Sequence, residues 1–214
     1  MDYNPSNLIL IAAFLGLIPL LVVLTTSFIK ISMVLILARE SLGVQQAPPN
    51  VLVYALSLVL SVYIMGGVFN KTYLAITADL QNPKLNPASL MSDIAMATNP
   101  LRDFLIKHSD DNEKSFFMSE LKRFWPANEA MTVKKTDFLI IVPSFVVHEI
   151  SQAFKIGFAL YLPSLIIDII ISNILMALGM MMMSPVTISL PIKLLLFISI
   201  DGWNRIIHLL FNTY

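Results

Sequence analysis

The stretch Ile156–Phe197 constrains this chain more than any other feature of its sequence. Asp168 is the only charged residue among the first 28 of these positions. About 20 apolar residues suffice for a helix to cross a bilayer. Four consecutive methionines, Met180–Met183, then lead into Ser184-Pro185 and a second apolar run. The pattern predicts an apolar hairpin with a thioether-rich tip, which is typical of a membrane assembly and not of a soluble enzyme core.

Composition supports a membrane protein with one polar domain. The chain is 57% hydrophobic and 13% charged, whereas globular domains carry roughly 25% charged residues. Its 14 basic and 14 acidic residues cancel, so no long-range field attracts nucleic acid. Cysteine is absent, which excludes disulfides and thiolate-bound metals. Of the 28 charged residues, 18 lie between Lys71 and Asp137, which predicts a polar domain between two hydrophobic blocks.

Residues 1–69 form the first hydrophobic block. Leu8–Ile29 is an apolar run without the basic leader or small-residue cleavage site of a secretory signal, so we expect it to be retained. We expect its helix to continue to Arg39-Glu40. Val51–Phe69 is the second predicted span.

Basic residues predict the orientation of this block. Lys30 and Arg39 flank the short connector 39–50, and short loops rich in Lys and Arg stay in the cytoplasm. The polar domain 70–137 then falls on the periplasmic side.

The polar domain reads as a set of short helices. Prolines divide it, and we expect helices at Pro87–Thr98, Leu101–His108 and Glu113–Phe124. In the last of these, aromatic and leucine residues recur at helical spacing. The simpler expectation is that this face packs on neighbouring helices. The alternative is a subunit contact through Phe116, Phe117 and Trp125.

Residues 138–214 form the second hydrophobic block. Phe138–Val147 is apolar but too short to span a membrane. Glu149 and Lys155 follow within a polar segment, where charges are costly in lipid unless they face protein or water. Apolar sequence resumes at Ile156, and a last apolar stretch covers Ile192–Ile200. The whole chain is therefore expected to be all-α; a conventional count gives four spans, of which the third and fourth do not have the form of regular membrane spans.

The methionine run suits a turn better than a helix. Consecutive helical residues point about 100° apart, so Met180, Met181, Met182 and Met183 cannot share one face. Gly179 before them and Pro185 after them favour the end of a helix. If several copies surround an axis, such flexible tips form a deformable seal. The alternatives are lipid-facing filler and, less favoured, a Cu(I) site.

Asp168 must be protonated, paired with a basic residue or in contact with water, because it lies in apolar sequence. If both arms are helical from a turn near Pro185, Asp168 lies roughly 25 Å from the turn and Arg205 roughly 30 Å. Arg205 is then the expected partner, while Lys193, at about 12 Å, fits poorly. A proton-relay carboxylate in a secondary transporter or proton channel is the functional alternative.

No catalytic motif is present. Glu149 follows His148, but Gln152 stands where a zinc-protease motif requires histidine. Phosphate-binding glycine loops and nucleophile-elbow motifs are absent from the sequence. We therefore expect no enzyme activity and no cofactor. Three function classes remain: a subunit of a membrane assembly, a transporter or proton channel, and an intramembrane hydrolase, which has the least support because no motif favours it.

Three blocks of the sequence resemble the FliP/SctR family of type III secretion export-apparatus proteins. The first runs from Thr25-Thr26-Ser27-Phe28 to the segment Leu42–Asn50, LGVQQAPPN. The second is NPLRDF at Asn99–Phe104. The third extends from Val142-Pro143-Ser144-Phe145 through Glu149, Ala153–Phe158, Asp168 and Met176–Pro185 to Ile188–Leu196 and Gly202-Trp203. Together the blocks cover nearly the whole chain.

The resemblance implies a membrane-embedded homo-oligomer, expected to be a pentamer, in a helical, cone-like export gate of the bacterial inner membrane, within the basal body. Its implied partners are subunits of the FliQ/SctS and FliR/SctT types and membrane lipid. Secreted effector and needle proteins are the implied cargo, and no nucleic acid is involved. The resemblance also places a methionine-rich loop at the narrow part of the pore, which is Met180–Met183 by position.

Two features differ from many family members. Flagellar members often carry a cleavable signal and a longer N-terminus, so the chain is expected to be an injectisome member of the Spa/Inv type. Many members also have a basic residue at the place of Ser151 or Gln152, whereas this chain has Lys155.

Overall fold

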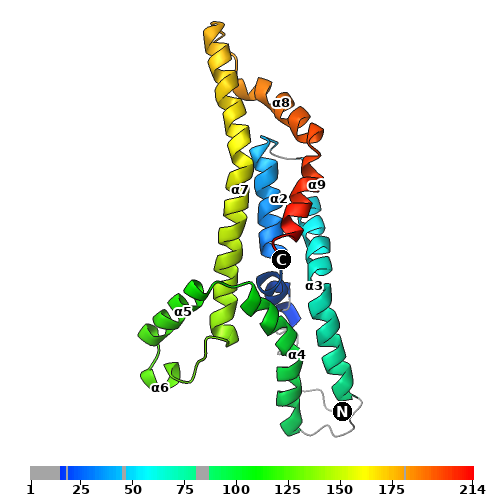
Figure 1. Cartoon of the computed structure of the whole chain (residues 1–214), viewed down its shortest axis with the longest axis vertical. Helices are drawn as coiled ribbons and strands as arrows, with labels where there is room; N and C mark the ends of the chain where they lie inside the picture. Colours follow the sequence, from blue (N-terminus) through cyan, green and yellow to red (C-terminus); the bar gives the residue numbers. More distant parts are fainter. Residues whose placement is uncertain (1–14, 18, 45–46, 81–86, 181) are drawn as a thin grey trace. The chain divides into compact units, whose positions relative to one another are not determined.

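The computed structural model of the chain describes residues 15–17, 19–44, 47–80, 87–180 and 182–214. Apart from the helical residues Leu15–Thr25, the described part contains eight helices and no strand. The helices, labelled in Figure 1, are α2 (Phe28–Ser41), α3 (Asn50–Leu80), α4 (Pro87–Lys107), α5 (Asp111–Phe124), α6 (Ala127–Ala130), α7 (Phe138–Ala177), α8 (Pro185–Ser199) and α9 (Gly202–Phe211).

The residues divide into two compact units. One consists of Met1–Ile29 with Met65–His148, and the other of Lys30–Ile64 with Glu149–Tyr214. Helices α3 and α7 each contribute residues to both units.

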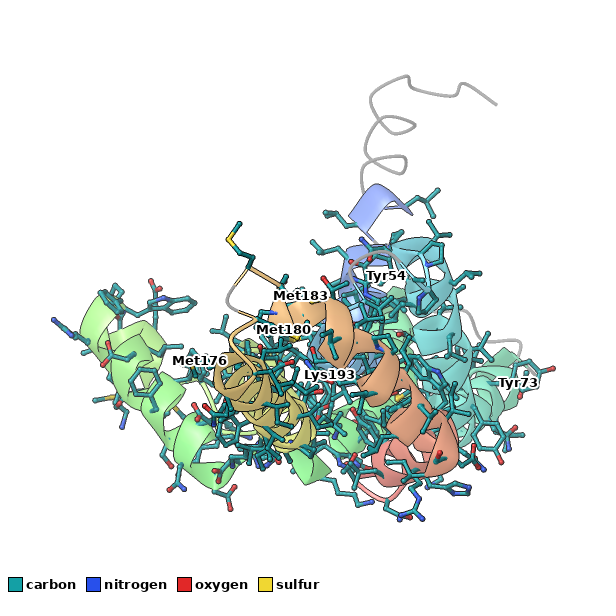
Figure 2. All side chains as sticks on the ribbon, turned by 90° about the horizontal axis from the view of Figure 1, so that it is seen from above. Tyr54, Tyr73, Met176, Met180, Met183 and Lys193 are labelled. Carbon is teal, nitrogen blue, oxygen red and sulfur yellow. The ribbon has the colours of Figure 1, made fainter. Side chains whose placement is uncertain are left out.

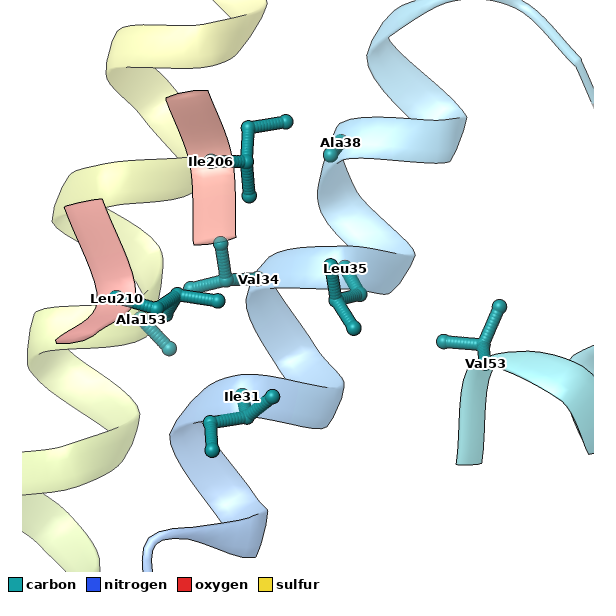
Figure 3. Close-up of a cluster of buried hydrophobic side chains, with 8 residues drawn as sticks. All are labelled: Ile31, Val34, Leu35, Ala38, Val53, Ala153, Ile206 and Leu210. Carbon is teal, nitrogen blue, oxygen red and sulfur yellow. The ribbon is translucent and has the colours of Figure 1, made fainter. Parts of the chain in front are cut away.

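The second unit is built around α2. Ile31, Val34 and Leu35 are fully buried on this helix and pack against Val53 of α3, Ala153 of α7, and Ile206 and Leu210 of α9. Figure 3 shows these side chains, which come from α2, α3, α7 and α9. Because the packed set comes from both ends of the chain, this unit depends on long-range contacts.

Close helix packing in this unit requires a glycine. A Cβ atom built at Gly157 of α7 would lie 2.3 Å from Leu37 Cδ1 and 3.0 Å from Leu37 Cβ of α2. These distances are shorter than packed carbon atoms tolerate. Gly157 therefore lets α2 and α7 approach at this point.

The first unit has two small cores. Leu105 of α4 packs with Ile141 and Phe145 of α7. Leu121 of α5, Ala130 of α6 and Ile140 of α7 form the other. The shorter α5 begins with an aspartate cap, since the Asp110 carboxylate accepts a hydrogen bond from the Asn112 backbone N–H. This bond also holds the pKa of Asp110 below its ordinary value.

The chain is an integral membrane protein by the length and composition of its helices. Among the described residues, Asn50–Thr77 and Phe138–Ala177 are long and apolar enough to cross a membrane. Two bent pairs bring the count to four if each pair is one span. One is Leu15–Thr25 with Phe28–Ser41, and the other is α8 with α9, bent by 61°. The all-α membrane fold expected from the sequence is confirmed.

Several predicted element boundaries were wrong. Helices predicted at Pro87–Thr98 and Leu101–His108 form one helix, α4, which runs through Pro100. The segment Phe138–Val147 is not a separate short element, because α7 continues for 40 residues through the polar positions. Proline within such helices is tolerated where surrounding groups satisfy the freed carbonyls.

The first predicted span, Leu8–Ile29, lies partly outside the described residues. Where it is described, its helix does not continue into the next one: helical residues end at Thr25, and α2 begins at Phe28. The second predicted span extends further than expected, since α3 passes Gly66-Gly67 and ends at Leu80.

Candidate functional site: the α7–α8 turn and the buried charges

The methionine run lies at the turn between α7 and α8, as the sequence predicts. Gly179 has a positive φ of 71°, which glycine adopts without steric cost. The Met180 N–H donates to the Leu175 carbonyl at 2.9 Å, and the Gly179 N–H donates to Met176 at 3.0 Å. These bonds satisfy carbonyls at the end of α7. Pro185 then starts α8 at its first turn, where the missing N–H costs nothing.

The described methionines of this turn point away from the core. Met182 is fully exposed, and Met180 and Met183 are each about two-fifths exposed. Figure 2 looks onto this end of the unit, with Met180 and Met183 beside Met176 at the end of α7. Met181 lies outside the described residues. The turn thus presents flexible thioether side chains beyond the last helical residues of both arms.

Asp168 pairs with Lys193, not with Arg205. The Lys193 Nζ lies 2.6 Å from Asp168 Oδ2, and Lys193 is buried. The expected pairing with Arg205 was wrong because it counted residues 178–184 as helix. Since α7 ends at Ala177, Asp168 lies about 14 Å from the end of its arm. Lys193 lies about 12 Å from the start of α8 at Pro185, so the two charges have matching depths.

A second buried ion pair joins α2 and α7. The Lys30 Nζ lies 3.2 Å from Glu149 Oε1, and the two side chains are 3% and 1% exposed. The Tyr214 hydroxyl donates to the other carboxylate oxygen of Glu149. The Lys30 ammonium also lies 3.6 Å from the centre of the Tyr214 ring. Three residues far apart in sequence therefore satisfy one another's charge and hydrogen-bonding groups within this apolar unit.

Sequence reasoning missed the partners of Glu149. From the sequence, Lys30 was expected only to orient the chain in the membrane, and no role was predicted for Tyr214. A usable signal was present, because Lys30 is the only charged residue between Asp2 and Arg39. Isolated opposite charges in separate apolar helices are candidates for one buried pair.

Arg39 holds the connector between α2 and α3. Its Nη1 donates to the Pro48 carbonyl at 3.0 Å and to Asn50 Oδ1 at 2.6 Å. Pro48 and Asn50, in the described part of the QQAPPN block, therefore accept hydrogen bonds from a buried arginine.

Lys155 and Arg205 have no ion-pair partner within the described part of the chain. Both side chains are exposed. Across the described ranges, no group of three or more His, Cys, Asp or Glu residues is arranged to hold a metal ion. The arrangement is thus two ion pairs between apolar helices, Lys30–Glu149 and Lys193–Asp168, with an exposed methionine turn between α7 and α8.

Comparison with known proteins identifies the family. The family model described as "FliP family" matches residues 10–210. The chain belongs to the FliP family. Among its relatives, the probable translocation protein y4yL of Sinorhizobium fredii is 44% identical, over 100% of this chain and 96% of that protein. The Yop proteins translocation protein R of Yersinia pestis is 43% identical, over 97% and 95%. The harpin secretion protein HrcR of Erwinia amylovora is 38% identical, over 100% and 98%.

Membership of the FliP family confirms the resemblance seen in the three sequence blocks. Because the relatives are covered over almost their full length, the match concerns the whole arrangement of helices and not one motif. The narrower Spa/Inv subtype stays a prediction.

Proposed function

We propose that this chain is a pore-forming subunit of the type III secretion export gate, through which unfolded proteins cross the bacterial inner membrane. Family membership supports the coarser part: the chain is a membrane-embedded component of a type III secretion apparatus. The exposed methionine turn between two apolar arms carries the finer part. The cargo would be effector and needle proteins, and the chain would need no catalytic residue of its own.

The surface of α7 supports assembly with other subunits. Large apolar residues are exposed at every fourth position along this helix: Phe158, Leu162, Ile166, Ile170 and Ile174. Residues four apart lie on the same side of a helix, so they form a continuous stripe. Apolar patches of this kind mark contacts with protein or lipid. We infer that neighbouring copies in a pentamer, and subunits of the FliQ/SctS and FliR/SctT types, cover much of it.

The methionine turn would then act as a gasket. In a ring of copies, the Met180–Met183 turns would converge on the axis and fill the irregular space between them. Methionine suits this role because its unbranched side chain adapts to gaps and to passing chains. A hydrophobic constriction of this kind blocks ions by excluding water.

The first unit offers a second contact surface. Phe116, Phe124 and Trp125 are exposed around a groove of about 430 Å³ beside α5. Leu121 and Phe117 of the same helix pack inward. The inward packing expected for this helix holds for Leu121 and Phe117, and we propose that the exposed aromatic side chains contact a neighbouring copy.

Conductance of the purified complex tests the gasket. We expect a variant with Met180, Met182 and Met183 changed to alanine to assemble normally but to leak ions in planar bilayers. Met131→Ala is the matched control, because Met131 is exposed but belongs to the other unit. Unchanged conductance in an intact triple-variant complex would refute the gasket.

A proton channel that uses Asp168 has less support. The Lys193 ammonium lies 2.6 Å from Asp168 Oδ2 and engages this carboxylate in a structural ion pair, whereas a relay group must bind and release protons. We expect an Asp168→Asn variant that assembles to secrete at the parental rate. Loss of secretion without loss of assembly would favour the channel.

A further inference from the structure

A half-open cavity of about 300 Å³ lies among α2, α7, α8 and α9. Its walls are mainly apolar, and the lining includes Leu42, Leu160, Pro163, Phe197 and Leu209. All of these residues belong to the second unit. The volume is within the range of ligand-binding pockets, so the cavity needs an occupant or a reason to stay empty.

The cavity has a net positive charge. Lys193 and Arg205 are its charged lining residues. Lys193 is neutralised by Asp168. Arg205 is exposed and lies beyond ion-pair distance of any carboxylate in the described ranges. Asp201, four residues earlier on the same turn, accepts a hydrogen bond from the Asn204 side chain instead. One guanidinium therefore remains available at an apolar cavity.

We propose that this cavity binds an anionic phospholipid, with an acyl chain against the apolar walls and the headgroup phosphate on Arg205. Arginine matches phosphate oxygens with paired N–H donors. Basic pockets between membrane helices are known to take anionic lipid headgroups. The surrounding bilayer supplies such a molecule directly, and the acyl chain accounts for the apolar walls that a free phosphate would leave unused.

A helix from a neighbouring subunit matches the cavity less well. Such a helix would have to bring a carboxylate to pair with Arg205, whereas a lipid phosphate pairs with the guanidinium directly. The proposal needs only a membrane location and does not depend on the pore.

Native mass spectrometry of the full-length protein tests the site. Delipidated protein in detergent is titrated with phosphatidylglycerol, and separately with phosphatidylcholine. We expect saturable binding of about one phosphatidylglycerol and weaker binding of phosphatidylcholine. Arg205→Gln should weaken phosphatidylglycerol binding by about fivefold, the effect of one basic residue at a membrane surface.

Two further variants separate the site from general effects. Ala159→Phe places a ring at a lining position that is itself exposed, so it should block the acyl chain without disturbing the core. Lys155→Gln removes an exposed cation of the same helix that does not line the cavity, and it should bind lipid like the parent. Circular dichroism and gel filtration confirm that each variant is folded.

Three results would overturn the proposal. In the first, folded Arg205→Gln and Ala159→Phe both bind phosphatidylglycerol like the parent. In the second, inorganic phosphate at millimolar concentration displaces the lipid completely, which indicates a site for a free anion. In the third, a cryo-microscopy map of the assembled complex shows polypeptide from a neighbouring subunit in the cavity.

Discussion

Removing the lysine of the buried Lys30–Glu149 pair should destabilise the second unit strongly. In Lys30→Met, a side chain of similar length replaces the ammonium, and the buried Glu149 carboxylate loses its ion-pair partner but keeps the hydrogen bond from the Tyr214 hydroxyl. At 3.2 Å, a charge pair in a medium of effective dielectric constant 20 attracts by about 5 kcal/mol. Breaking one side of a buried pair costs about 3–5 kcal/mol in measured cases. We therefore expect the free energy of unfolding to fall by about 3–5 kcal/mol.

Unfolding in mixed micelles, followed by tryptophan fluorescence, measures this loss. Trp203 reports on the unit that contains the pair. The matched control is Lys155→Met, which removes an exposed lysine and should change the free energy of unfolding by less than about 0.5 kcal/mol.

A double variant separates charge pairing from packing. Lys30→Met with Glu149→Gln removes both charges but keeps an acceptor for the Tyr214 hydroxyl. Because the unpaired buried charge is gone, its stability should return to within about 1–2 kcal/mol of the parent. If the double variant is as unstable as the sum of the two single variants, the loss comes from packing and the electrostatic reasoning is wrong.

Two further predictions concern packing and capping. Gly157→Ala should lower the free energy of unfolding by about 1–3 kcal/mol, because the added methyl group overpacks against Leu37. Thermal unfolding measures this loss. The double variant Gly157→Ala with Leu37→Ala should recover part of the stability, since removal of the clashing side chain makes room. The lowered pKa of Asp110 means that its contribution to α5 is present above the ordinary aspartate pKa and is lost as the pH falls through the lowered value. Hydrogen-exchange protection of α5 should therefore fall in acid for the parent but change less for Asp110→Asn, which caps without titrating; equal acid sensitivity in both proteins would contradict this.

Local sequence signals predicted the local structure well. The helix expected at Glu113–Phe124 is α5, which begins two residues earlier. The turn expected between Gly179 and Pro185 is present, because a positive-φ glycine and a proline at the first helical turn act within a few residues of chain. Such features need no information from distant parts of the protein.

Predictions that needed distant residues were less successful. The polar segment around Glu149 looked like a break in a membrane span, yet α7 continues through it. It does so because Lys30, 119 residues away, neutralises the carboxylate. The partner of Asp168 was predicted wrongly for a related reason. The residues between Ala177 and Pro185 form a turn and not helix, so Asp168 lies closer to the tip of its arm than expected, level with Lys193.

The amino-acid sequence by itself determined that this is an all-α membrane protein of the FliP family with a methionine turn between two apolar arms. Hydrophobic run length, turn chemistry and recurrent motifs are properties of neighbouring residues, so they can be read along the chain. Only the tertiary structure decided that Lys30 meets Glu149, that Lys193 meets Asp168, and that Arg205 remains beside an apolar cavity. Charge pairing in an apolar medium depends on the axial position and rotation of each helix, and packing between helices fixes both.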